Sequence, residues 1–111
     1  MDSKVHLVGK TNVTLSNIIF LKAEANYSEV FMTDGQRIVL SKTLKQMETI
    51  FVPLGFYRPH KSFLINLQHV VSCSVHTDRR IELTNNFKAE LSRRKKNDFL
   101  EIRNNKKVSH C

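Results

Sequence analysis

The fold class of this chain is decided by the stretch Tyr27-Ser28-Glu29-Val30-Phe31-Met32-Thr33-Asp34-Gly35-Gln36-Arg37-Ile38-Val39-Leu40. Asp34-Gly35 is the strongest short signal for a two-residue hairpin turn, and β-branched and aromatic residues flank it on both sides. The stretch therefore predicts an antiparallel hairpin of residues 27–33 and 37–40.

Short apolar runs of the same character continue in both directions from this hairpin. Residues 81–91 alternate apolar and polar positions around Asn85-Asn86, which is typical of a hairpin with one solvated face. The other runs predict strands at 5–8, 13–15, 18–23, 63–65 and 70–75, with a second strand-rich block beginning at Tyr57. Together they predict a mainly β fold of short strands with one or two short helices.

The first helix is predicted from the spacing of residues 43–51. Thr43 and Gln46 have the form of a capping box, and Leu44, Met47, Ile50 and Phe51 follow at helical spacing. We expect these four apolar side chains to pack on the sheets. Pro53 and Gly55 then end the helix.

A second helix is predicted over residues 93–103, with Ser92 as its N-cap. Its first turn, Arg93-Arg94-Lys95-Lys96, carries four consecutive cations, which the helix macrodipole disfavours at that end. Residues 92–111 hold seven Lys and Arg against two acidic residues, so the positive charge of the chain is concentrated here. A locally unfavourable run of this kind indicates a functional site, and its charge favours an anionic partner.

Length and composition exclude several classes of protein. The 111 residues, with a formal net charge of +8, fit one domain, which we place at residues 1–105 with a flexible tail at 106–111. The apolar runs are too short to span a membrane, and two cysteines do not make a disulfide scaffold, so we expect a cytoplasmic protein.

Signatures of catalysis and of bound cofactors are absent from the sequence. The three glycines are isolated, so there is no glycine-rich phosphate loop, and no carboxylate pair stands out. Cys73, His76, His110 and Cys111 include metal-ligand types but do not form the two compact pairs of a zinc site. We therefore expect no enzyme, no cofactor and no metal.

Three segments carry the residue types that contact DNA: Ala23–Tyr27, Arg58–Asn66 and Leu91–Lys95. The last two supply Arg and Lys side chains, a hydroxyl, an amide and an imidazole, which suit phosphates and base edges. For His60 and Asn66 an alternative is equally open at this point, namely a side chain hydrogen-bonded within its own chain.

The pattern Arg-x-His-Lys-Ser-x-Leu-Ile-Asn at 58–66 resembles the central signature of the LytTR DNA-binding domain of bacterial transcription regulators. The stretches 17–27 and Leu91-Ser92-Arg93-Arg94 resemble the opening and closing motifs of that family. The resemblance covers about residues 5–103. It implies about ten short strands in three small stacked sheets, and loops that enter successive major grooves of duplex DNA, often on imperfect direct repeats.

Roles follow from the resemblance position by position. It implies base contacts for Arg94, Lys61 and Tyr27. The remaining matched or neighbouring positions would contact the DNA backbone or hold the loops, and these are Asn26, Arg58, His60, Ser62, Asn66, Arg93, Lys95 and Lys96. Two departures, Pro59 and Ala25, stand where the family commonly has a small apolar residue and a glycine.

The expected partner is double-stranded promoter DNA, bound by a monomer or a weak dimer. Family members usually carry a receiver domain, so a receiver or a sensor-kinase pathway is a further expected partner, and this chain is either a stand-alone regulator or a piece of a longer one. Two alternative functions stay open: a protein-interaction domain that has lost DNA reading, and a single-stranded nucleic-acid binder on a β platform.

Overall fold

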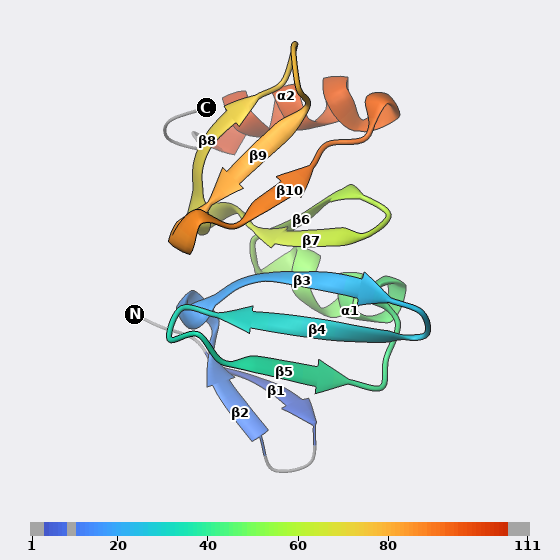
Figure 1. Ribbon diagram of the computed structural model, residues 1–111, viewed down its shortest axis with the longest axis vertical. Helices are drawn as coiled ribbons and strands as arrows, with labels where there is room; N and C mark the ends of the chain where they lie inside the picture. The colour runs from blue at the N-terminus through green and yellow to red at the C-terminus, as the bar shows by residue number, and fades with distance from the viewer. Residues whose placement is uncertain (1–3, 9–10, 107–111) are drawn as a thin grey trace.

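The computed structural model describes residues 4–8 and 11–106, and within them the chain forms ten strands and two α-helices (Figure 1). The strands make three antiparallel sheets, of two, five and three strands. The strands are β1 (Lys4–Val8), β2 (Thr11–Thr14), β3 (Ile18–Glu24), β4 (Tyr27–Met32), β5 (Arg37–Leu40), β6 (Phe56–His60), β7 (Phe63–Asn66), β8 (Val70–Ser74), β9 (Arg80–Leu83) and β10 (Lys88–Glu90).

The central sheet has the strand order β5-β4-β3-β7-β6 and contains the hairpin predicted from Asp34-Gly35. The turn is longer than the predicted two residues. The Gly35 N–H donates to the Met32 carbonyl and the Met32 N–H to the Gln36 carbonyl, with Gly35 at φ +92°. This is the pattern of a three-residue loop, in which a left-handed glycine closes the turn.

Helix α1 (Leu44–Phe51) confirms the capping box, because the Gln46 N–H donates to Thr43 Oγ1 and the Thr43 N–H donates to Gln46 Oε1. Leu44, Met47 and Phe51 are buried against the sheet as predicted. Ile50 was expected on the same stripe but is exposed. The three buried positions form a narrow stripe along α1, which is about two turns long, and Ile50 lies outside the edge of that stripe.

The three-stranded sheet, in the order β10-β9-β8, carries helix α2 (Lys96–Lys106). The predicted helix start at Arg93 is wrong by one turn, because Arg93–Lys95 form a separate 3-10 turn before α2. Ser92 occupies the cap position, but its hydroxyl makes no capping hydrogen bond. Lys106, predicted to begin the tail, is the last residue of α2, and residues 107–111 of that tail lie outside the described residues.

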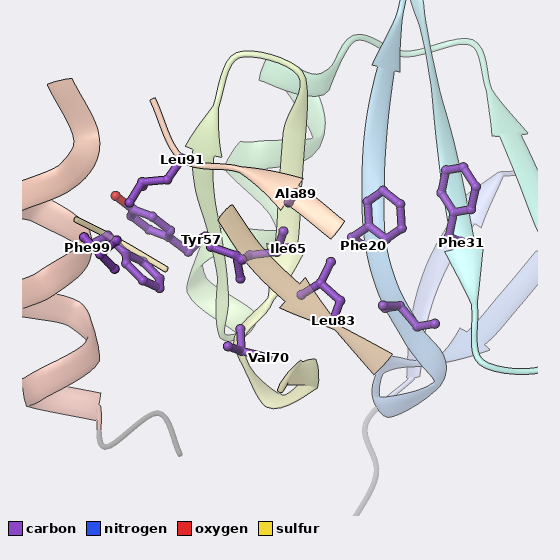
Figure 2. Close-up of a cluster of buried hydrophobic side chains, with 12 residues drawn as sticks. Phe20, Phe31, Tyr57, Ile65, Val70, Leu83, Ala89, Leu91 and Phe99 are labelled. Atoms are coloured by element: carbon purple, nitrogen blue, oxygen red, sulfur yellow. The ribbon is translucent and has the colours of Figure 1, made fainter. Parts of the chain in front are cut away.

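Two buried clusters lie on opposite faces of the central sheet. Leu21 and Leu64 face α1 in one cluster, whereas Phe20 and Ile65 face the other cluster, which continues to Phe99 on α2. Figure 2 shows this second cluster running from Phe31 and Phe20 through Ile65 and Tyr57 to Phe99. The alternation along β3 and β7 therefore fixes the central sheet between two layers.

Candidate nucleic-acid interface

Three loop segments lie along one edge of the molecule, on the right in Figure 1. They are the β3–β4 turn (residues 24–27), the β6–β7 turn (residues 58–63) and the segment from β10 into α2 (residues 91–96), and we call them the loop edge. Two backbone hydrogen bonds tie them together: the Ala23 N–H donates to the Ser62 carbonyl at 2.9 Å, and the Ser92 N–H donates to the Pro59 carbonyl at 2.8 Å. The edge is thus one continuous unit held by the strands behind it.

The β6–β7 turn is braced by two side chains of its own motif. Arg58 donates from Nη1 to Glu48 Oε1 and from Nη2 to the Lys61 carbonyl, both at 2.8 Å. The Ser62 N–H donates to His60 Nδ1 at 3.1 Å. Because Nδ1 accepts this bond, the neutral ring carries its proton on Nε2, which lies 3.3 Å from a carboxylate oxygen of Glu90.

These contacts divide the roles expected of the central motif. Arg58 and His60 make their hydrogen bonds and ionic contacts within the protein, which supports a role for both in holding the loop. Lys61, which follows His60, is exposed, and its side chain makes no ion pair or hydrogen bond within the described residues. The turn therefore presents one unpaired cation on a fixed backbone.

The 93–95 turn is held by a contact from β6 to the start of α2. Tyr57 Oη donates to Asp98 Oδ2 at 2.8 Å, and Lys95 Nζ lies 5.8 Å from the centroid of the Tyr57 ring. Burial of the tyrosine, together with this hydrogen bond and the charge of Asp98, raises the pKa of Tyr57 above its ordinary value. Arg93 and Arg94 are exposed on this turn.

The second and third segments meet in a pocket of about 340 Å³. The sequence predicts six of the seven residues that line it as site residues or as the adjoining cap. The lining consists of Arg58, His60, Lys61, Ser92, Arg94, Lys95 and Glu48. Arg94 and Lys61, far apart in the sequence, therefore line one concave surface.

The first segment stands beside this pocket and does not line it. Asn26 is exposed at the tip of the β3–β4 turn, and Tyr27 is half-buried at the start of β4. Ala23 connects this turn to Ser62, as described above, so Asn26 and Tyr27 belong to the same edge.

Asn66 lies at the other end of β7, away from the loop edge. Its side chain is 3% exposed, donates to the Ile18 carbonyl at 2.9 Å and accepts from the Gln68 N–H at 3.0 Å. Every strong hydrogen-bonding atom of this amide is engaged in the core. The alternative left open for Asn66, an amide bonded within its own chain, is what the structure has.

Sequence reasoning missed the carboxylates that organise the loop edge. Glu48 on α1 holds Arg58, Glu90 on β10 faces His60, and Asp98 on α2 accepts from Tyr57. Each lies on a different element from its partner, between 10 and 41 residues away along the chain. Nothing in the local pattern around any of the three signals the contact.

Other kinds of site find little support in the part of the chain that the structure describes. No group of three or more His, Cys, Asp and Glu side chains there could hold a metal ion; His110 and Cys111 lie outside it. None of the helices described is long and apolar enough to cross a membrane. All Phe and Tyr residues of the chain lie within the described ranges, and each of them is buried or half-buried.

Comparisons with known proteins identify the family and the fold. The family model described as the LytTr DNA-binding domain matches residues 9–104. Among solved structures, the chain is similar to the LytTr DNA-binding domain of a protein described as a methyl-accepting/DNA response regulator from Bacillus cereus, with a TM-score of 0.70 and 20% sequence identity over 92% of this chain and 94% of that one. At that identity the likeness shows the fold alone. A search of curated proteins finds no match.

Proposed function

The chain belongs to the LytTr DNA-binding domain family, and we propose that it binds double-stranded DNA sequence-specifically as the output domain of a bacterial transcription regulator. In this proposal the loop edge lies along one side of the duplex, and its segments enter major grooves of imperfect direct repeats. The observation that carries the proposal is the convergence of Arg94 and Lys61 on one pocket.

Base reading falls to the exposed side chains of the edge. Within the described residues the Arg94 guanidinium makes no ion pair or hydrogen bond, and its two parallel donors match the O6 and N7 acceptors of guanine. Lys61 presents an ammonium group at the tip of its turn and tunes the sequence preference of a second contact. Tyr27, with Asn26 beside it, supplies the contact of the first segment.

Preorganisation supports specific rather than general binding. The bonds of Arg58 and His60 both fix the peptide group that joins Lys61 to Ser62, since Arg58 donates to the Lys61 carbonyl and His60 accepts from the Ser62 N–H. Tyr57 and Asp98 similarly fix the base of the turn that carries Arg94. A side chain presented from a fixed backbone loses less conformational entropy on binding, so more of its interaction energy distinguishes one base from another.

Backbone contacts fall to the remaining cations and polar groups of the edge. Arg93, Lys95 and Lys96 flank Arg94, and Ser62 lies beside Lys61. Among the described residues, these three cations make no ion pairs, so their charges are available to phosphates. Phosphate contacts of this kind fix the register on the duplex and make affinity depend on salt.

The dimensions of the domain suit a site of about one helical turn. Its principal axes are 41 × 33 × 24 Å, and the long axis runs vertically in Figure 1, parallel to the line of the three segments. One turn of B-DNA is about 34 Å. One domain per repeat is therefore sufficient, and two copies on a direct repeat need no symmetric dimer.

Single-stranded binding is disfavoured by the aromatic residues. Stacking of unpaired bases needs exposed aromatic faces. Phe20 and Phe31 instead stack on each other with ring centroids 4.5 Å apart, and Phe87 packs on both. The core uses the aromatic surface that this alternative would need.

The test is a comparison of affinities for two duplexes. A direct repeat selected from a random duplex pool and a scrambled duplex of the same composition are titrated by fluorescence anisotropy at near-physiological salt. We expect the repeat to bind tighter by a factor of about a thousand or more. Failure of the selection to enrich any sequence, together with capture of a stable protein partner, would instead favour the interaction-domain alternative.

A further inference from the structure

A second and larger pocket, of about 670 Å³, opens beside the loop edge. It lies between the β6–β7 turn and the strands β9 and β10, and it shares five lining residues with the loop edge: His60, Phe63, Leu91, Ser92 and Arg93. Neither the sequence motifs nor the proposed base contacts assign it a role. Its charged lining consists of Arg79, Arg80, Lys88, Arg93, Asp78 and Glu90.

The charge of this pocket is positive and largely uncompensated. Within the described residues, none of its four Arg and Lys side chains makes an ion pair. Of its two carboxylates, Glu90 faces His60 and Asp78 is exposed. Four cations around one concavity repel one another, and an anion bound among them relieves that repulsion.

Two buried polar atoms of the lining have no hydrogen-bond partner in the described part of the chain: Arg79 Nε and Ser92 Oγ. Buried groups of this kind are normally paired, because an unpaired donor forfeits its bonds to water. Both residues line the same pocket, and both can donate. A ligand with several acceptor oxygens would satisfy them together.

The backbone at Arg79 is also unusual. Its φ is +50°, in the left-handed region that disfavours residues with a side chain, and the Leu91 N–H donating to its carbonyl at 2.8 Å holds it there. Strain at such a position is consistent with a side chain placed for a ligand.

We propose that this pocket binds a phosphate group through Arg79 and Ser92, with Lys88, Arg80 and Arg93 supplying the surrounding positive charge. A phosphate offers several acceptor oxygens and more charge than a carboxylate, and arginine binds it with paired donors. The group comes from one of two sources, a backbone phosphate of the duplex or free phosphate. The first source rests on the proposed function, and the second does not.

The first arm of the test uses no DNA. Inorganic phosphate is titrated into the full chain at constant ionic strength, and backbone amide shifts are followed by NMR. We expect saturable shifts at Arg79 and Ser92, with affinity about tenfold lower in Arg79→Gln and several-fold lower in Ser92→Ala. Lys4→Gln, which removes an exposed charge from β1, should bind phosphate as the unchanged chain does. Because the Ser92 hydroxyl has no hydrogen-bond partner among the described residues, Ser92→Ala should not lower the unfolding temperature.

The second arm measures the salt dependence of binding to the scrambled duplex, so it does not depend on sequence reading. A slope that falls by about one in Arg79→Gln, and not in Lys4→Gln, identifies a backbone phosphate as the occupant. Saturable phosphate binding with an unchanged slope identifies free phosphate. The proposal is overturned if the pocket variants match Lys4→Gln in both arms, whether or not the chain selects a DNA repeat.

Discussion

At one end of the β6–β7 hairpin, Asn66 is buried with its amide bonded to the Ile18 carbonyl and the Gln68 N–H. At the other end, Lys61 is exposed on a turn held by Arg58 and His60, and its side chain has no ion pair or hydrogen bond in the part of the chain that the structure describes. Both ends belong to one nine-residue sequence motif. The difference separates two kinds of motif residue. One whose polar atoms are hydrogen-bonded inside the protein maintains the fold. One whose side chain is exposed on a fixed backbone is available to a partner.

The largest expected effect separates the two ends by stability. Asn66→Ala removes a buried amide and leaves the Gln68 N–H and the Ile18 carbonyl without the hydrogen bonds that this amide makes to them. We therefore expect the free energy of unfolding to fall by about 3 kcal/mol. Urea denaturation measures this change. Asn104→Ala, at an exposed position of α2, is the control and should change stability by less than about 0.5 kcal/mol.

The same variant tests the division of roles. The folded fraction of Asn66→Ala should bind the selected repeat as the unchanged chain does. A large loss of affinity with stability preserved would place Asn66 in the interface and remove the contrast between the two ends.

Arg94→Ala should show the opposite behaviour. Loss of one bidentate base contact is expected to lower affinity for the selected repeat by about 1–3 kcal/mol. Stability should be almost unchanged, because the side chain is exposed and has no ion pair or hydrogen bond to any described residue. Anisotropy titration measures the affinity. Arg103→Ala, toward the far end of α2, controls for removal of one positive charge.

Tyr57→Phe tests the contact that holds the third segment. Loss of the hydrogen bond to Asp98 should lower the free energy of unfolding by about 1 kcal/mol at neutral pH. Because the pKa of Tyr57 is raised in the folded state, the unfolded chain loses this proton first as pH rises above about 10, and stability then falls. The variant should show a shallower alkaline loss; an identical pH profile would mean that the tyrosine is not buried against Asp98.

The smallest effect concerns Lys95, for which we propose an electrostatic contact with the DNA backbone. Lys95→Ala should weaken binding to selected and scrambled duplexes alike and reduce the salt slope by about one. Affinities measured over a range of salt concentrations give both quantities. A change in the preference between the two duplexes would show that Lys95 reads bases.

Local patterns predict much of the architecture. The strands, the hairpin at Gly35 and the capping box of Thr43 follow from residues that contact near neighbours in the chain, and the family motifs locate the loop edge. Contacts between distant elements escape such patterns. The pairing of Glu48 with Arg58, the exposure of Ile50 and the 3-10 turn before α2 all depend on how the layers pack, which no local spacing contains.

The most direct test of the loop edge as a reading surface is a base-substitution scan of the selected repeat with the unchanged chain and with Arg94→Ala. Each position of the duplex is changed in turn, and its effect on affinity is measured for both proteins. We predict that one guanine matters to the unchanged chain and no longer matters to the variant, while every other position keeps its effect. If the variant stays sensitive at every position, Arg94 reads no base, and the assignment of sequence reading to the loop edge is contradicted.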